Sequence, residues 1–180
     1  MDRRVLADSR RWVCSRATGD TLEVAIGTGL NLPHYPPGLR ITGVDWSAEM
    51  VRLADERAAR ERRPVSTLQA DAADLPFPDA SFDSFVCTFS MCCIPDLRGA
   101  LREAARVLRP GGRLLLADHV VSTNPLIRAA QHVAETVSVP LRGEHYTRRP
   151  LPIVHELGLE VVATERLTAG MVERVHATRR

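Results

Sequence analysis

The sequence contains no lysine, because all 24 of its basic residues are arginines. This absence excludes every mechanism that needs a lysine, including a Schiff base and the lysine of a phosphate-binding loop. Cysteine is also scarce, and Cys14, Cys87, Cys92 and Cys93 are too unevenly placed for a disulfide framework. We therefore expect a reducing, cytoplasmic compartment.

Long apolar runs are missing as well. No stretch approaches the ~20 apolar residues of a membrane-spanning helix, and residues 1–4 lead into no apolar signal core. The sequence therefore predicts neither secretion nor an integral membrane segment. The formal net charge is only +2, which gives no support for a nucleic-acid partner.

The rest of the composition is that of an ordinary globular protein, with 44% hydrophobic and 26% charged residues. The length of 180 residues is close to that of one domain. Because the sequence shows no internal repeat, low-complexity segment or linker, we predict a single domain over residues 1–180.

Apolar runs of strand length alternate with segments of helical period. Strands are expected at residues 21–26, 41–45, 66–69, 84–89, 113–119, 159–166 and 171–177. Helices are expected at residues 3–16 (within an N-terminal segment 1–20), 47–60, 97–108, 125–139 and 151–157. The Pro-Gly-Gly of residues 110–112 is expected to stop the third helix. This order predicts an α/β fold, with a doubly wound, mostly parallel seven-stranded sheet closed by an antiparallel hairpin.

The residues that carry chemistry gather where the first strand ends, in the sequence LEVAIGTGLN of residues 22–31. Ligands of parallel sheets bind beyond the carboxyl ends of the strands, where glycines let the backbone approach them. A dinucleotide fingerprint needs a third glycine where this chain has Leu32, followed by Pro33. Glu23 would also repel a pyrophosphate, whereas an acid suits a ligand with an amino group and a sulfonium. A tight turn that binds nothing is the alternative.

Two more acids end the next two strands. Asp45 stands 22 residues after Glu23, where a carboxylate can accept both hydroxyls of a ribose. Asp71 can accept a hydrogen bond from an adenine amino group, while the Ala72 amide addresses a ring nitrogen. Each acid alone is better explained as a surface residue. Acids at the carboxyl ends of three successive strands indicate a nucleoside site.

Four segments in order resemble the successive motifs of class I S-adenosylmethionine-dependent methyltransferases. They are LEVAIGTG (22–29), GVDWSAEM (43–50), DAADLPFPDASFD (71–83) and VLRPGGR (107–113). Within that superfamily the chain is similar to the branch of ubiquinone/menaquinone-biosynthesis C-methyltransferases and bacterial phosphatidylethanolamine N-methyltransferases. The sequences NLPHY (31–35) and DHV (118–120) favour the second group and thiol methyltransferase-like relatives.

The resemblance implies a Rossmann-like methyltransferase fold with S-adenosyl-L-methionine as cofactor. It places Asp45 on the ribose, Trp46 against the adenine, Asp71 and Ala72 at the adenine edge, and the glycine loop beside the methionine part. The end of the fourth strand would lie beneath the methionine. The implied cofactor-binding residues are Glu23, Gly27, Thr28, Gly29, Asn31, Asp45, Trp46, Asp71, Ala72, Cys87 and Phe89.

The acceptor side of the site is expected to be covered by residues 120–150. Only 21 residues precede Leu22, which leaves a single helix in place of the usual helical lid. We expect that helix, or the second subunit of a homodimer, to help close the site. An apolar cover favours a small, lipophilic acceptor. The apolar face of the covering helix is predicted to comprise Leu126, Ile127, Ala130, Val133, Ala134 and Val137.

Methyl transfer from a sulfonium is an in-line displacement, which depends mainly on how the two reactants are positioned. A general base is needed only where the acceptor must first lose a proton. The candidate catalytic residues are His119, at the end of the fifth strand, and His145 and Tyr146. A hydrogen-bonded wall of the site is the alternative role for His119.

No metal is expected, since no histidine stands at ligand spacing near the cysteines at 87, 92 and 93, which are interpreted as core residues. The arginines of the first helix (Arg3, Arg4, Arg10, Arg11 and Arg16) are expected to form a solvated face, with contact to an anionic head group as the alternative.

The leading hypothesis is therefore a methyltransferase that acts on a small molecule, with the acceptor atom left open. The first alternative is a module of the same fold that binds the cofactor without turnover. A nicotinamide oxidoreductase is disfavoured by Leu32. A nucleic-acid methyltransferase is disfavoured because residues 89–92 read Phe-Ser-Met-Cys rather than Asn-Pro-Pro-aromatic.

Overall fold

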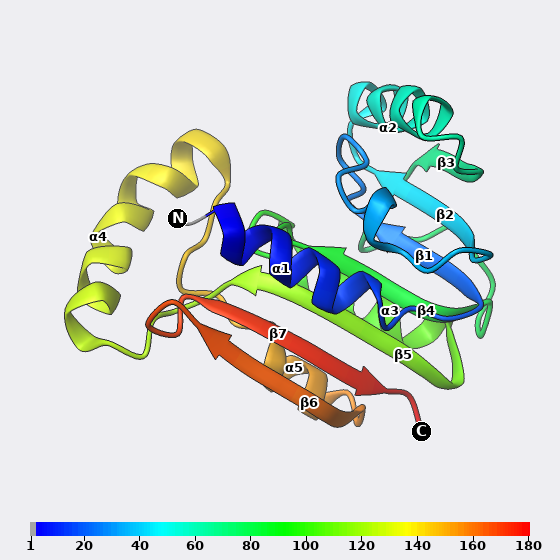
Figure 1. Cartoon of the computed structure of the whole chain (residues 1–180). Coiled ribbons are helices and arrows are strands. Elements are labelled where there is room, and N and C mark those ends of the chain that lie inside the picture. The colour runs from blue at the N-terminus through cyan, green and yellow to red at the C-terminus, as the bar shows by residue number, and fades with distance from the viewer. Residues whose placement is uncertain (1–2) are drawn as a thin grey trace.

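The computed structural model describes residues 3–180, and its strands form one seven-stranded sheet (Figure 1). The strand order is β3-β2-β1-β4-β5-β7-β6. Strands β1 to β5 run parallel, and β7 runs antiparallel to both of its neighbours. The predicted doubly wound sheet with a closing hairpin is confirmed. The strands are β1 Asp20–Val24, β2 Arg40–Asp45, β3 Val65–Gln69, β4 Phe82–Thr88, β5 Leu108–His119, β6 Glu160–Leu167 and β7 Val172–Thr178.

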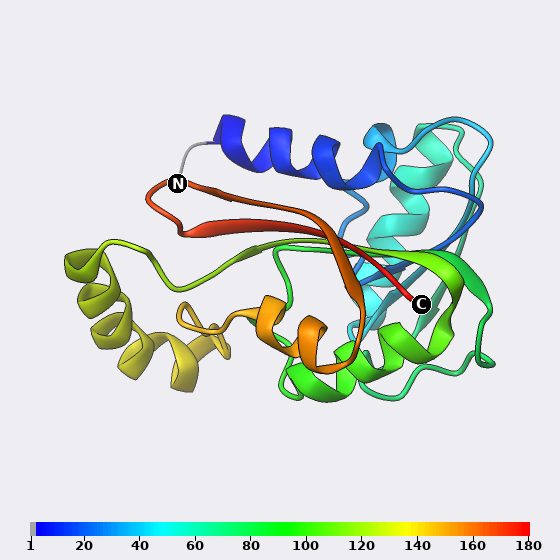
Figure 2. The same ribbon diagram turned by 90° about the horizontal axis from the view of Figure 1, so that it is seen from below.

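Helices cover both faces of this sheet (Figures 1 and 2). Helices α1 and α2 share one buried cluster with one face, and α3 and α5 share a second cluster with the other. Helix α4 projects beyond the carboxyl edge of β5 and buries none of its residues. The helices are α1 Arg3–Cys14, the 3₁₀-helix η1 Leu32–His34, α2 Ala48–Arg60, α3 Leu97–Val107, α4 Pro125–Arg142 and α5 Pro150–Glu156.

Local signals in the sequence explain where two of the helices begin. The Ser47 hydroxyl accepts a hydrogen bond from the Met50 N–H, as expected of the cap of α2. The Asp96 carboxylate accepts one from the Gly99 N–H and caps α3 in the same way. Each cap thereby fixes the residue at which its helix begins after the preceding strand.

Two predicted boundaries are wrong. The Pro-Gly-Gly of residues 110–112 does not stop α3, because β5 begins directly at Leu108. The pairing of β5 with β4 is interrupted between Leu108 and Arg113, so these residues form an irregularity within the strand. Helix α4 continues through Pro140 to Arg142 and ends at Gly143, whose φ of 68° lies in the left-handed region. Proline is tolerated in this last, exposed turn, where a lost backbone hydrogen bond leaves a carbonyl open to water.

No helix within residues 3–180 is long and apolar enough to cross a membrane.

Candidate functional site

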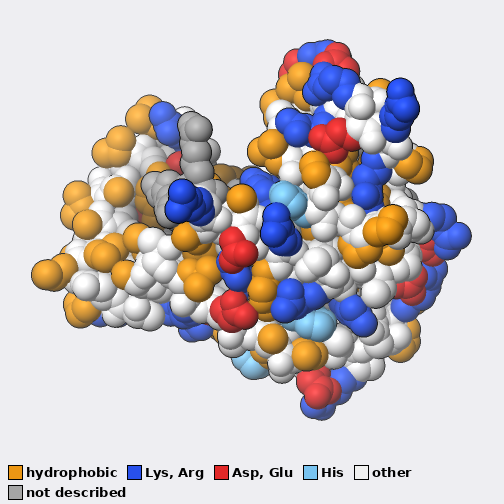
Figure 3. All heavy atoms as spheres, in the orientation of Figure 1, with side chains coloured by type: hydrophobic (Ala, Val, Ile, Leu, Met, Phe, Trp, Pro, Cys, Tyr) orange, Lys and Arg blue, Asp and Glu red, His pale blue; other side chains and the backbone are white. Residues whose placement is uncertain are grey.

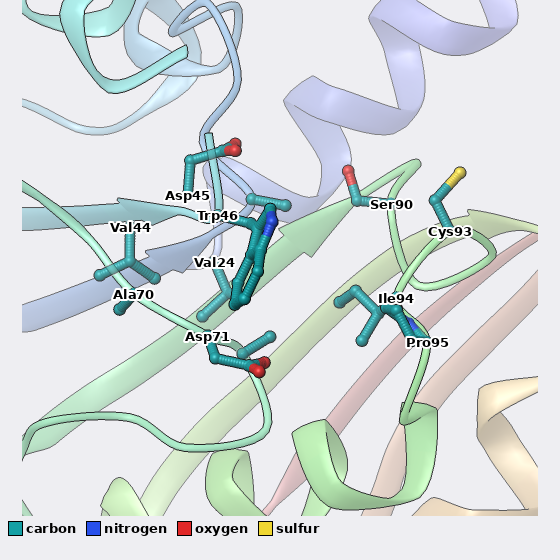
Figure 4. Close-up of a pocket in the computed structure, with 12 residues that line it drawn as sticks. Val24, Val44, Asp45, Trp46, Ala70, Asp71, Ser90, Cys93, Ile94 and Pro95 are labelled. Atoms are coloured by element: carbon teal, nitrogen blue, oxygen red, sulfur yellow. The ribbon is translucent and has the colours of Figure 1, made fainter. Parts of the chain in front are cut away.

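A cavity of about 430 Å³ opens at the carboxyl edge of the sheet (Figure 4). It lies beside β1, where the direction of the strand order reverses, and open α/β sheets bind their ligands at this point. Successive strand ends supply one wall and the loop after β4 supplies the other. The lining residues are Val24, Ala25, Val44, Asp45, Trp46, Ala70, Asp71, Ala72, Ser90, Cys93, Ile94 and Pro95.

The carboxylate of Asp45 is held in one orientation by backbone N–H groups. Its Oδ2 accepts a hydrogen bond from the Gly27 N–H at 2.9 Å, and its Oδ1 accepts one from the Ser47 N–H at 3.0 Å. Each oxygen keeps a further lone pair for a ligand. The cavity thus contains a fixed, ionisable acceptor at the end of β2.

The adjoining residues combine an aromatic surface with a second acid. The Trp46 side chain is 73% exposed, and Figure 4 shows its indole between the carboxylates of Asp45 and Asp71. The Asp71 Oδ1 accepts a hydrogen bond from the Ala73 N–H at 2.9 Å. Tryptophan side chains are largely buried on average, and a flat ligand stacked on the Trp46 ring would cover it.

The loop after β1 turns sharply beside the cavity. Gly27 and Gly29 have φ of 56° and 74°, and Thr28 lies between them. A Cβ placed on Gly27 would meet no atom within 4 Å, so the backbone faces open space there. Ala25 also has a positive φ of 55°, a conformation that residues other than glycine rarely adopt. The loop can approach a ligand with its backbone.

Glu23 does not line the cavity, because it is buried beneath that loop. Its Oε1 accepts a hydrogen bond from the Asn31 side-chain amide at 2.8 Å, and its Oε2 accepts one from the Tyr35 hydroxyl at 2.7 Å. Burial raises the pKa of Glu23 to about 7, although both hydrogen bonds act against that rise. Glu23 and Asn31 therefore support the loop from below.

Arg10 completes this network, which corrects the prediction that its side chain is solvated. Its guanidinium donates to the Asn31 Oδ1 at 2.9 Å and to the Thr88 hydroxyl at 2.8 Å. It also lies 5.1 Å from the ring centroid of Phe89. Burial lowers the pKa of Arg10, while Glu23 acts in the opposite direction. Arg10, Tyr35 and Thr88 are the members that sequence reasoning missed.

The residues predicted at the end of β4 lie at different depths. Cys87 is fully buried in the core cluster that includes Leu22 and Phe85. Phe89 has a φ of 56° and packs beside the His119 ring, with 5.0 Å between the ring centroids. Neither Cys87 nor Phe89 is among the residues that line the cavity.

None of the three candidate catalytic residues lines the cavity, although His119 and His145 lie beside Cys92 in the loop after β4. The His119 Nε2 is buried and has no hydrogen-bond partner among the described residues, and burial lowers the pKa of this imidazole. The His145 backbone N–H donates to the carbonyl oxygen of Cys92 at 3.0 Å. The Tyr146 hydroxyl donates to the Glu144 carboxylate at 2.7 Å.

The cysteines differ from the sequence interpretation in two ways. Cys93 is exposed and lines the cavity, so it is not a core residue as Cys87 and Cys92 are. In addition, the fold brings a histidine to the cysteines, because Cys92, Asp118 and His119 each offer one ligand atom and these atoms lie within 4.8 Å of one another. The absence of a histidine nearby in the sequence therefore does not exclude one nearby in the fold.

The expected apolar cover is not formed by α4. Its apolar side chains are exposed, with 82% of Leu126, 70% of Val133 and 59% of Val137 accessible to solvent. Half-buried polar residues face the protein instead. The Gln131 side chain, for example, donates to the carbonyl oxygens of Val120 and Tyr146.

This strand order, with a cavity at the point of reversal and acids after β2 and β3, defines a Rossmann-like fold with a candidate nucleoside site. The sequence model of a family described as a methyltransferase domain matches residues 22–116, more than half of the chain. The protein belongs to this family, the class I S-adenosylmethionine-dependent methyltransferases, whose cofactor is S-adenosylmethionine.

Curated relatives agree with this assignment. The chain is 41% identical over 103 residues to a phosphatidylethanolamine N-methyltransferase of Cereibacter sphaeroides, covering 56% of this chain and 51% of the relative. It is 35% identical over 130 residues to a demethylmenaquinone methyltransferase of Deinococcus radiodurans, covering 68% and 54%. The chain thus spans about half the length of the curated relatives that it matches.

Solved structures show the same fold. YcgJ of Bacillus subtilis superposes with a TM-score of 0.74 at 26% identity, over 92% of this chain and 73% of that one. A geranyl diphosphate methyltransferase in complex with S-adenosylmethionine gives 0.79 at 17% identity, over 98% and 86%. The [4+2]-cyclase SpnF gives 0.78 at 19% identity, over 97% and 80%, so the fold by itself does not fix the reaction.

Proposed function

We propose that this protein transfers a methyl group from S-adenosylmethionine to a small, lipophilic acceptor. The observation that carries the proposal is the cavity at the carboxyl edge, where an oriented carboxylate, an exposed indole and a second acid follow one another along the strand ends. The cofactor supplies a methyl carbon already activated by its bond to a sulfonium. The protein must then bind the cofactor and the acceptor, orient them toward each other and exclude water from between them.

The nucleoside half of the cofactor fits the residues after β2 and β3. Asp45 has a free lone pair on each oxygen and would accept the two ribose hydroxyls. Trp46 would stack on the adenine ring, which would cover its exposed face. Asp71 and the Ala72 N–H would bind the adenine edge.

The methionine half would follow the loop after β1. The open space at Gly27 lets the backbone approach the ligand, and Thr28 and Gly29 continue the same turn. Glu23 and Asn31 would hold this loop in place rather than touch the cofactor, since their polar atoms bind Tyr35 and one another. Cys87 and Phe89 would lie beneath this part of the site without lining the cavity.

A lipophilic acceptor is supported by the far wall of the cavity. Ile94 and Pro95 line it, and apolar surface there suits an apolar substrate better than a charged metabolite. The names of the two curated relatives point to a lipid and a quinone precursor. His119, His145 and Tyr146 surround this wall and would contact the acceptor or hold the loop that does.

The proposal is tested by measuring cofactor binding and turnover separately. S-adenosylhomocysteine should raise the melting temperature, and NAD should not, because only a ligand of the native state stabilises it. Release of S-adenosylhomocysteine from S-adenosylmethionine should then depend on an added lipid, quinone or thiol acceptor. The His119→Ala variant should lose turnover and keep cofactor binding, whereas a control at the exposed His155, His155→Ala, should keep both.

Two other outcomes have a definite meaning. Stabilisation by NAD with none from S-adenosylhomocysteine would overturn the cofactor assignment. Tight cofactor binding with no turnover on any acceptor pool would indicate that the protein is a module of the methyltransferase fold that binds the cofactor without catalysis.

A further inference from the structure

A group of three side chains beside the cavity has the composition of a metal site. The Cys92 thiol, the Asp118 carboxylate and the His119 imidazole each offer one ligand atom, and these atoms all lie within 4.8 Å of one another. Cys92 comes from the loop after β4, whereas Asp118 and His119 end β5. Because β4 and β5 are parallel neighbours, their carboxyl ends bring together residues that are 26 positions apart.

The carboxylate is already oriented as metal-binding carboxylates are. Asp118 is only 2% exposed. Its Oδ2 accepts a hydrogen bond from the Cys92 N–H at 3.1 Å, and its Oδ1 accepts one from the His119 N–H at 2.7 Å. The Met91 N–H and the Cys92 thiol also interact with this carboxylate, so a bound cation would take the place of the thiol proton. Such supporting hydrogen bonds fix the direction of a ligating group.

The histidine has a nitrogen to offer. The Nε2 atom of His119 is buried and has no hydrogen-bond partner among the described residues, which is a costly arrangement for an imidazole nitrogen. A cation would satisfy this atom and compensate the buried carboxylate of Asp118 at the same time.

A second thiol stands at the side of the group that faces the cavity. The Cys93 Sγ lies 3.7 Å from the Cys92 Sγ, and Cys93 also lines the cavity. Two sulfurs bound to one tetrahedral zinc ion are ~3.8 Å apart, given a zinc–sulfur bond of about 2.3 Å. The separation of the thiols therefore already matches shared ligation.

We propose that Cys92, Asp118 and His119 form a binding site for a zinc ion, with a fourth position left open. Sulfur, nitrogen and oxygen donors together suit zinc, whereas magnesium and calcium prefer oxygen alone. The site goes beyond the proposed methyl transfer and does not depend on it. With the ion bound, His119 acts as a ligand and not as a free base.

The test is a titration of metal-free protein with Co²⁺, followed by displacement with Zn²⁺. We expect one ion per chain and a thiolate-to-cobalt charge-transfer band. Cys92→Ser and His119→Ala should each weaken binding at least tenfold, and Cys93→Ser should weaken it less. Cys14→Ser and His176→Ala are matched controls, because they change another buried thiol and the other histidine with an unpartnered, buried Nε2.

The proposal fails if the wild-type protein binds no cobalt, or if the charge-transfer band persists in Cys92→Ser. Far-ultraviolet circular dichroism of each variant reports whether it has folded. If Cys92→Ser does not fold, alkylation of the wild-type protein decides the question. Zn²⁺ should protect Cys92 from a thiol reagent under partly denaturing conditions, and equal alkylation with and without zinc would overturn the site. None of these readouts uses methyl transfer, so the two proposals fail separately.

Discussion

Asp45 combines a structural and a binding role in one side chain. Its two oxygens hold the loop after β1, through Gly27, and the first turn of α2, through Ser47. An asparagine at this position would keep one acceptor and the shape of the side chain, but would lose the charge. Its amide nitrogen cannot accept from a backbone N–H, so the substitution also removes one of the two contacts that hold the loop and the first turn of α2.

We expect Asp45→Asn to weaken binding of S-adenosylhomocysteine at least tenfold, since a hydrogen bond to a charged group contributes roughly 1.5–3 kcal/mol. Isothermal titration calorimetry measures the change. Asp55→Asn, which alters a carboxylate of α2 that binds the Thr67 hydroxyl, is the control and should bind normally. Unchanged affinity of Asp45→Asn would place the ribose elsewhere.

Glu23 makes stability depend on pH. Burial raises its folded-state pKa from an ordinary value of 4.5 to about 7. Between these two values the unfolded chain releases the proton and the folded protein retains it, so the free energy of unfolding falls as pH rises. The contribution of Glu23 is complete below about pH 4.5 and is lost by about pH 7, and it amounts to about 3 kcal/mol.

Glu23→Gln should flatten this part of the profile, as measured by urea unfolding between pH 5 and pH 8. Asp118, whose pKa burial raises to about 6, contributes a slope of the same sign that should remain. The exposed Glu160→Gln variant should keep the full slope. A Glu23→Gln profile as steep as that of the wild type would contradict the assignment.

Sequence reasoning identified the residues at the carboxyl ends of the strands better than the buried residues that support the loop after β1. Asp45, Trp46, Asp71 and Ala72 line the cavity as expected, because the carboxyl end of a parallel strand fixes where the next residue lies. The position of Arg10 could not be read in the same way. Arg10 and Arg11 look equivalent in sequence, and only the packing of α1 on the sheet turns Arg10 inward and leaves Arg11 exposed.

At the scale of the elements, α4 shows how a periodic pattern can be correct and its orientation wrong. The apolar residues do share one side, but Gln131, Glu135 and Ser138 lie on an adjoining side, about a third of a turn around the helix. These three hydrogen-bond to residues 120–122 and 144–147 and so hold the polar side against the protein. Periodicity alone does not say which side of a helix meets its neighbour.

The exposed position of α4 predicts unequal effects of matched substitutions. Val137→Gln, on the outer side of α4, should change the free energy of unfolding by less than about 0.5 kcal/mol. Val154→Gln, at a fully buried position of α5, should cost several times more, because it places an amide in the core. Urea unfolding measures both. A large loss in Val137→Gln would show that α4 packs inward as the expected cover, or that its outer side joins a second subunit.

At the scale of the whole molecule, the sheet connects all the parts. Buried clusters lie on both of its faces, and β4 and β5 contribute to each cluster. Space-filling atoms show a hollow between the part that carries α4 and the part that carries α2 (Figure 3). The sheet crosses below this hollow without a break in strand pairing.

A single domain over residues 1–180, as the sequence predicts, should unfold in one cooperative step. Circular dichroism of the helices and fluorescence of Trp12 and Trp46 should give coincident urea transitions, since the two indoles lie in α1 and after β2. Two separated transitions would divide the chain into independent units. If α4 alone unfolded at a lower urea concentration, most of the circular dichroism signal would remain, and this result would still be consistent with one domain.

The exposure of Cys93 makes the protein unusually easy to label at one place. Of its four cysteines, all of which the structure describes, the other three are buried. Hydrogen bonding from Cys92 also lowers the pKa of the Cys93 thiol, which increases its reactive thiolate. With no lysine in the sequence, amine reagents have no side chain to modify. A maleimide fluorophore would therefore attach at the wall of the cavity and could report directly on whether the cavity is filled.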